Sequence, residues 1–128
     1  MLVEDTLLIA GGAAVGAVAR KLVSEVTPSP WGTLVVNVVG SGVLGALAAS
    51  PSRPKQMLVL GVGFCGALTT FSTFSVDMVQ LVKSGAFLKA GLFLFANNGL
   101  GIGAAAAGYF LRRKLLMSSS PKSNGDHS

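Results

Sequence analysis

Hydroxyl and aromatic side chains gather in the middle of an apolar stretch, at a depth where a membrane-spanning helix usually carries only hydrocarbon. The run is GALTTFSTFS, residues 66–75, and the apolar stretch around it covers residues 57–82. No charged residue occurs between Lys55 and Asp77. Polar groups within a bilayer are costly unless they pair with protein, water or an ion. We therefore expect this run to carry the function.

The first half of the run predicts an interruption in the helix that contains it. Small residues permit a close approach between segments. The hydroxyls of Thr69 and Thr70 can then bond the backbone groups that an interrupted helix leaves without partners. Asp77 is the only acidic residue in this apolar segment, and we expect it near the aqueous end.

The composition places the chain among membrane proteins. Of its 128 residues, 51% are hydrophobic and only 12% are charged, and the mean hydropathy is +0.66. A soluble domain of this size would need far more polar surface. The ten Lys and Arg residues punctuate the apolar segments. We interpret them as helix-end anchors in a multi-pass protein of the cell membrane, not as a nucleic-acid surface.

Four apolar segments predict an all-α membrane protein with four transmembrane helices, the third of them broken. Each is close to the ~20 residues that a helix needs to cross the hydrocarbon. The expected spans are residues 6–23, 32–50, 56–82 and 87–111. We assign residues 1–117 to one membrane domain. Residues 118–128 form a Ser-rich polar tail that has nothing to bury, so we expect it to be disordered.

Small residues recur four positions apart in three of these spans. Such pairs let helix backbones approach closely in lipid, so we expect them to mark helix contacts. The pairs are Gly12 and Gly16, Ser41 and Gly45, and Gly99 and Gly103.

The basic residues give almost no preference for one orientation in the membrane. Leaving out the distant Lys122, five lie on the side of the N-terminus and four on the other side. They are Arg53, Lys55, Arg112, Arg113 and Lys114 against Arg20, Lys21, Lys83 and Lys89. The positive-inside rule then gives almost no preference for either orientation, so we expect the chain to insert in both orientations.

Three segments together resemble the Fluc family of fluoride channels. GFCGALTTFSTFS at residues 63–75 is similar to the family signature. GGAAVGAVAR at residues 11–20 and GTLVVNVVGS at residues 32–41 resemble the patterns of the first and second helices. The resemblance runs from about residue 6 to 113. It implies a passive, fluoride-selective channel that exports fluoride as an antiparallel, dual-topology homodimer with two pores.

The resemblance places the family's pore phenylalanines at Phe71 and Phe74. Phenyl edges carry partial positive charge, which an anion can approach. Asn37 supplies an amide NH₂, and Ser72 and Thr73 supply hydroxyls. Such donors can replace the water around fluoride without the full positive charge that would trap it. From the residues alone, the phenylalanines would be ordinary packing contacts. For Asn37, the residues alone leave two interpretations open: a hydrogen bond to a neighbouring helix, or a pore donor.

Two further pore candidates follow the family pattern less closely. The family places Arg20 at the pore vestibule, although an anchor at the membrane interface explains the same residue. In the fourth span, the family commonly has a small hydroxyl residue near Asn97, whereas this chain has Asn97 and Asn98. Asn97 can still donate to an anion, so it stays in the predicted pore.

The resemblance also implies a structural Na⁺ ion at the dimer interface. By position, its ligands are the backbone carbonyls of Gly66 and Thr69 in the broken third helix. An unwound helix exposes carbonyls, and oxygen ligands suit a hard cation.

Other functions explain less of the sequence. No nucleotide loop or catalytic constellation is present, and the one histidine, His127, lies in the tail, so we do not expect an enzyme. The main alternative is a small dual-topology multidrug exporter, which needs a carboxylate deep in its first span. Here Glu4 and Asp5 precede that span. A membrane scaffold without transport activity explains the glycines but not the clustered donors.

Overall fold

Four helical segments are long and apolar enough to cross a membrane. In the computed structural model, which describes residues 2–50 and 53–120, every regular element is a helix. The four segments are α1 (Val3–Val26), α2 (Trp31–Ala48), the composite span Pro54–Lys83 and α6 (Phe87–Ser118). The predicted all-α membrane fold and its four spans are confirmed.

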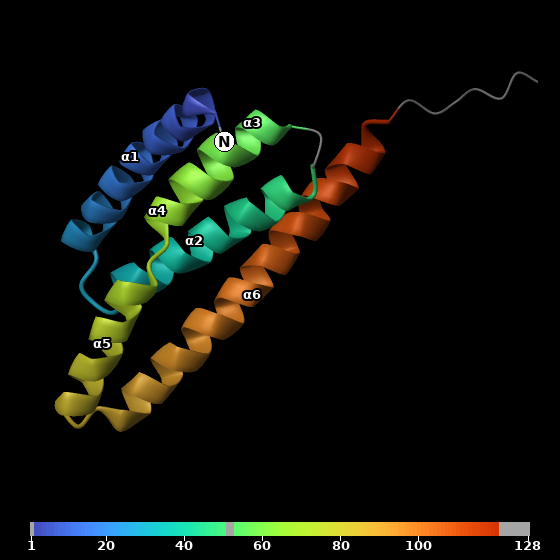
Figure 1. Cartoon of the computed structure of the whole chain (residues 1–128). Helices are drawn as coiled ribbons and strands as arrows, with labels where there is room; N and C mark the ends of the chain where they lie inside the picture. The colour runs from blue at the N-terminus through green and yellow to red at the C-terminus, as the bar shows by residue number, and fades with distance from the viewer. Residues whose placement is uncertain (1, 51–52, 121–128) are drawn as a thin grey trace, which may run out of the picture.

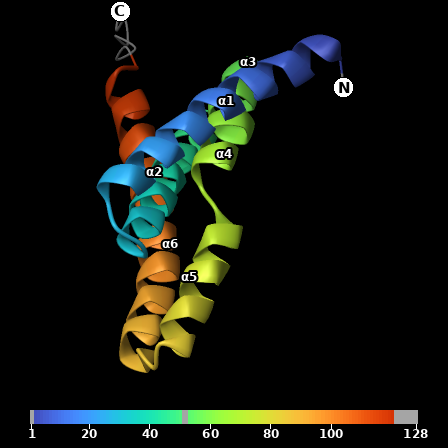
Figure 2. The same cartoon turned by 90° about the vertical axis from the view of Figure 1, so that its left-hand side faces the viewer.

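The composite third span consists of four consecutive helical pieces. They are α3 (Pro54–Gln56), the π-helical η1 (Met57–Cys65), α4 (Gly66–Leu68) and α5 (Phe71–Lys83). Between α4 and α5 the chain is extended, with φ/ψ of −77°/152° at Thr69 and −150°/120° at Thr70. Figure 2 shows this extended link, which separates the two halves of the span.

The helices pack in two groups around this link. α1 packs mainly along η1 and α4, while α6 packs mainly along α2 and also contacts α5. Figure 1 shows α1 beside the first half of the third span, and α5 beside the start of α6. The extended residues therefore lie where the two groups meet.

Two buried glycines allow α1 to approach η1 backbone to backbone. A Cβ added at Gly12 would collide with the Val59 carbonyl oxygen, and one added at Gly16 would collide with the Phe64 carbonyl oxygen. On α6, by contrast, a Cβ added at Gly99 or Gly103 would meet nothing within 4 Å. The same small-residue spacing thus marks a filled contact on α1 and an open face on α6.

Two helices extend beyond the spans predicted from hydropathy. α1 begins at Val3 and takes Glu4 and Asp5 into its first turn, where acidic side chains favour the helix dipole. α6 has 32 residues and continues through three basic residues to Ser118. The expected polar tail therefore starts at a helix end, and its residues 121–128 lie outside the described part of the chain.

Candidate functional site

A cavity of about 470 Å³ adjoins the extended link of the third span. Its walls come from α2, both halves of the third span and α6. Among the residues that line it are Asn37, Gly66, Thr69, Phe71, Phe74 and Asn97. Most of the residues predicted to bind ions therefore share one hollow, although they come from three different spans.

Asn37 pairs with both backbone polar groups of Thr70. Its Oδ1 accepts a hydrogen bond from the Thr70 N–H at 2.7 Å, and its Nδ2 donates to the Thr70 carbonyl at 3.2 Å. Nδ2 also donates to Oδ1 of Asn97 at 3.2 Å. A backbone segment without helical partners must find others inside a membrane, and this side chain supplies them. Both N–H groups of Asn37 are thereby committed to protein acceptors.

The hydroxyl of Thr70 caps α5 and joins a small polar cluster. Thr70 Oγ1 accepts a hydrogen bond from the Thr73 N–H at 3.1 Å, which satisfies one free donor at the helix N-terminus. The same oxygen donates to Thr73 Oγ1 at 3.2 Å and lies 3.2 Å from Ser72 Oγ. Ser72 and Thr73, the two residues predicted as hydroxyl donors, therefore both contact the hydroxyl of Thr70, which belongs to the extended link.

Three phenylalanine rings lead from the molecular surface to the core. The centroids of Phe71 and Phe74 are 5.8 Å apart, and those of Phe74 and Phe93 are 5.2 Å apart. Phe71 is 79% exposed, whereas Phe93 is fully buried. The exposed ring of Phe71 is therefore available to an anion or to another chain. The buried ring of Phe93 packs against Phe74 at the other end of the row.

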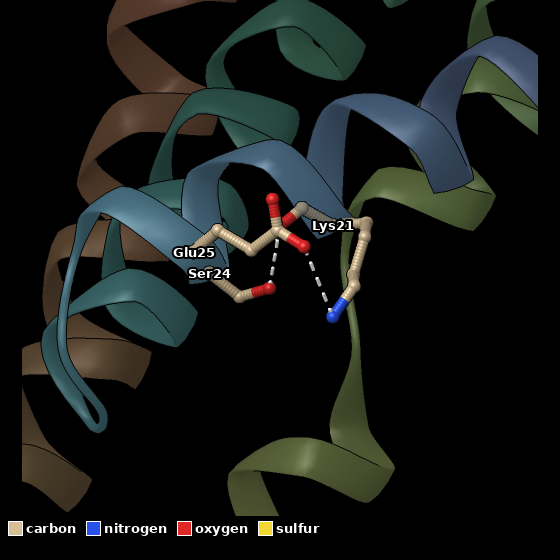
Figure 3. A network of polar contacts seen from close by, with 3 residues as sticks. All are labelled: Lys21, Ser24 and Glu25. Atoms are coloured by element: carbon tan, nitrogen blue, oxygen red, sulfur yellow. Dashed lines mark hydrogen bonds and ion pairs between the residues drawn. The ribbon is translucent and has the colours of Figure 1, made fainter.

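A second, smaller cavity of about 180 Å³ also borders Thr70. Arg20, Lys21, Thr33 and Thr73 are among the residues that line it, and Thr70 lines both cavities. The Lys21 ammonium lies 3.3 Å from the carboxylate of Glu25, one turn further along α1. Figure 3 shows this pair together with Ser24, whose hydroxyl bonds the Lys21 carbonyl. The pair is exposed and adds little stability.

A family comparison agrees with the arrangement of these residues on four spans. The protein-family model described as "CrcB-like protein, Camphor Resistance (CrcB)" matches residues 7–109. The chain belongs to the CrcB-like family.

Curated relatives of this CrcB-like chain share much of its sequence. A Vibrio cholerae protein named "Fluoride-specific ion channel FluC" is 51% identical over 114 residues, covering 79% of this chain and 89% of the relative. A Photobacterium profundum protein of the same name is 46% identical over 128 residues, covering 87% and 98%. A Synechococcus protein named "Fluoride-specific ion channel FluC 2" is 40% identical over 122 residues, covering 94% and 88%.

In this CrcB-like protein, the backbone at the extended link suits the predicted Na⁺ ligands. In an unbroken helix, the Gly66 carbonyl would accept from the Thr70 N–H, which instead donates to Asn37. The Thr69 carbonyl would accept from the Thr73 N–H, which instead donates to Thr70 Oγ1. Both Gly66 and Thr69 line the large cavity. The carbonyl oxygens of Gly66 and Thr69 therefore lack their helical hydrogen bonds, and carbonyl oxygens are ligands that a hard cation prefers.

Sequence reasoning singled out Asp77 but did not predict the burial of its carboxylate or its hydrogen-bond partners. Asp77 is only 5% exposed, and its carboxylate accepts hydrogen bonds from Thr33 Oγ1 at 2.6 Å and from Ser29 Oγ. These bonds connect α5 to the start of α2 and to the loop before it. Phe93 was also missed, although it lies four residues before Asn97 and so on the same face of α6.

Proposed function

We propose that two antiparallel copies of this chain form a fluoride channel with two pores. The protein is a fluoride channel rather than an enzyme, because it belongs to the CrcB-like family and its relatives are named fluoride-specific ion channels. It is a multi-pass membrane protein, and in bacteria such a channel lies in the inner membrane. The pore residues, the dimer and the Na⁺ ion are proposals that rest on the arguments below.

The observation that carries the proposed pore is the shared lining of the large cavity. Asn37, Phe71, Phe74 and Asn97 border it, so two amides and two phenyl rings surround one space. Fluoride is small and strongly hydrated, and it enters a pore only if several donors replace its water together. In the free chain both N–H groups of Asn37 are bonded to protein, so an anion would have to displace one of these bonds to use that amide. The ring edges of Phe71 and Phe74 face the same cavity, and no described residue that lines it carries a fixed positive charge.

The two cavities give the proposed path a direction. Arg20 lines the smaller cavity and attracts anions toward Thr70 and Thr73, which border the same space. Ser72 approaches the Thr70 hydroxyl from α5. Thr70 also lines the large cavity, so an anion that passes it reaches the phenylalanines.

Passive conduction is sufficient for export. Hydrogen fluoride is a weak acid whose neutral form crosses lipid and dissociates inside, where the pH is higher. A pore then lets the anion leave down the membrane potential, and no energy-coupling group is needed. The multidrug-exporter alternative lacks its carboxylate, since Glu4 lies at the start of α1 and pairs with Lys55 at 2.6 Å.

A second copy of the chain would complete the site. Phe71 is 79% exposed beside the large cavity, and the Gly99 and Gly103 face of α6 is open. An antiparallel partner would cover these surfaces and bring a second extended link to the centre. The carbonyls of Gly66 and Thr69 from both copies would then hold one Na⁺ ion.

The direct test is fluoride efflux from liposomes that contain only this protein, with chloride as the control anion. We expect rapid fluoride efflux and little chloride efflux. Equal rates for the two anions would contradict fluoride selectivity.

The dimer is tested separately, through the orientation of single chains. A cysteine placed after residue 118 should react with impermeant reagents from both sides of the membrane, because the native Cys65 is buried. Labelling from one side alone would contradict dual topology and leave the channel function standing.

A further inference from the structure

Four hydroxyl side chains border the smaller cavity, and three of them give their proton to a protein acceptor. Ser24 donates to a backbone carbonyl of its own helix at 2.8 Å, and Thr33 donates to the Asp77 carboxylate at 2.6 Å. Thr70 donates to Thr73 Oγ1 at 3.2 Å. Because a hydroxyl has only one proton to give, these three side chains offer acceptor oxygens, not donors, to an anion in this cavity.

The charged donors of the smaller cavity are two neighbouring cations on α1. Arg20 and Lys21 both line it, and none of the described residues that line it is acidic. A guanidinium and an ammonium each carry several N–H groups and no acceptor. These two side chains are therefore the groups of the cavity best suited to hold an arriving anion.

Lys21 differs from Arg20 because a carboxylate already holds its charged end. Its Nζ lies 3.3 Å from Oε1 of Glu25, and the two side chains are 72% and 56% exposed. Figure 3 shows the Glu25 carboxylate turned toward the Lys21 ammonium. Within residues 2–50 and 53–120, no carboxylate forms an ion pair with Arg20. An exposed ion pair is weak, so an anion can compete with Glu25 for the ammonium.

We propose that Lys21 is a second anion-binding cation at the entrance of the conduction path, and that Glu25 sets its affinity for anions by competing with them. This proposal rests on the proposed fluoride conduction and deepens it. Arg20 attracts the anion at all times, whereas Lys21 does so only as far as Glu25 releases it.

Such a pair meets two opposing requirements of an entry site. Two unopposed cations would raise the local concentration of anions, but they would also slow the departure of each anion. A carboxylate within reach returns to the Lys21 ammonium as the anion moves on toward Thr70, which lines both cavities. The pair therefore favours entry at low fluoride concentration without creating a trap.

The first experiment measures initial fluoride efflux from liposomes at low and at saturating internal fluoride. Glu25→Gln removes the competing charge and keeps the shape of the side chain. We expect efflux at low fluoride to rise about twofold to fivefold, in line with the small free energy of an exposed ion pair. At saturating fluoride we expect little or no gain, because the change is one of affinity.

Glu4→Gln is the matched control for this variant. Glu4 also forms an exposed ion pair, with Lys55 at 2.6 Å, but it lies in the first turn of α1 and lines neither cavity. Its efflux should equal that of the unmodified protein. Equal efflux in the two variants at low fluoride, or an equal gain at both fluoride concentrations, would overturn the role of Glu25.

Reversing the ion pair separates attraction of the anion from stability of the helix. The double variant Lys21→Glu with Glu25→Lys keeps the pair, its spacing on the helix and the net charge, but places the carboxylate at the cavity. We expect efflux at low fluoride to fall at least about fivefold. Unchanged efflux would show that the pair only stabilises α1 and would overturn the proposal.

Ionic strength tests whether the competition is electrostatic. Raising it from about 0.01 M to about 1 M with a salt of a large, impermeant anion shortens the screening length from about 30 Å to about 3 Å. The gain of Glu25→Gln over the unmodified protein should then largely disappear. A gain that persists in full at the higher ionic strength would contradict the proposal.

The unmodified protein distinguishes the failure of this proposal from the failure of the proposed function. If the unmodified protein releases no more fluoride than chloride, the channel function itself is wrong. If it conducts fluoride selectively and any comparison above gives the opposing result, only the roles of Lys21 and Glu25 are wrong.

Discussion

The third span contacts the rest of the protein in two different ways on either side of its extended link. Before the link, η1 meets α1 backbone to backbone, because Gly12 and Gly16 have no side chain to keep the helices apart. At the link, Thr70 meets a polar side chain, Asn37, which bonds both its N–H and its carbonyl. The first contact depends on shape and the second on hydrogen bonds.

This difference follows from where the backbone finds its partners. Within η1, hydrogen bonding is internal to the helix, so a neighbour needs only to fit closely. At Thr70 the helix is interrupted, so a neighbour must supply a donor and an acceptor. We therefore expect changes at the first contact to affect folding and changes at the second to affect conduction.

Asn37→Asp tests the second contact and should have the largest effect on conduction. The carboxylate can still accept from the Thr70 N–H, but it faces the Thr70 carbonyl and Asn97 Oδ1 with oxygen in place of a donor. We expect fluoride efflux to fall at least about 100-fold, because two hydrogen bonds give way to repulsion. Near-normal efflux in a dimer of normal size would show that the bond to Thr70 is dispensable.

Gly12→Ala tests the first contact and should reduce stability. Its new Cβ would collide with the Val59 carbonyl oxygen, and helix backbones cannot yield as side chains do. We expect a cost of about 3 kcal/mol, measured as a lower thermal midpoint in detergent. Gly11→Ala is the matched control, because its Cβ would meet nothing within 4 Å. If the two variants were equally stable, close backbone approach would not hold α1 in place.

Phe71→Ile tests whether the link region acts through its aromatic edges. The aliphatic side chain keeps most of the volume but loses the positive ring edge, so we expect a roughly tenfold fall in fluoride efflux. Phe74→Ile should act in the same direction. Phe95→Ile is the control, since Phe95 is also a highly exposed phenylalanine and lies on α6. Unchanged efflux in both Phe71→Ile and Phe74→Ile would remove the aromatic role.

Replacement of Na⁺ by a bulky organic cation should have the smallest effect on the folded chain. The proposed carbonyl ligands, Gly66 and Thr69, belong to the link, so loss of the ion should weaken the dimer and leave each four-span fold intact. The measurement is the dimer fraction by size exclusion after thorough exchange, with K⁺ as a second replacement ion. An unaltered dimer and unaltered efflux would contradict the ion site.

Hydropathy was sufficient to predict the four spans, because the thickness of a membrane fixes the length of an apolar helix. The two extended residues, Thr69 and Thr70, also lie within the run that predicted an interruption. The bonds between Asn37, Thr70 and Asn97 were beyond prediction, because they join three spans that are far apart in the sequence. Local patterns report how a helix begins and ends, but not which neighbour it meets.

Two other features show the same limit. Gly12 and Gly99 each begin a small-residue pair, yet only Gly12 meets a neighbour within the chain. The expectation that Asp77 lies near the aqueous end of its span did not include its partners, the hydroxyls of Ser29 and Thr33, or its 5% exposure. In the first case the sequence identified a glycine that permits a close helix contact, and in the second a carboxylate that needs hydrogen-bond partners. Only the tertiary structure shows which neighbour each residue meets.

The length of α6 has a consequence for the lipid environment of the protein. At 1.5 Å per residue its 32 residues extend about 48 Å, well beyond a hydrocarbon layer about 30 Å thick. The turn with Arg112 and Arg113 suits the headgroup region, so only the apolar part of the helix before it must fit the hydrocarbon, and tilting accommodates its excess length. Because α6 carries Asn97 and packs along α2, a change in its tilt reaches the large cavity. Fluoride efflux should therefore vary with the acyl-chain length of the host bilayer.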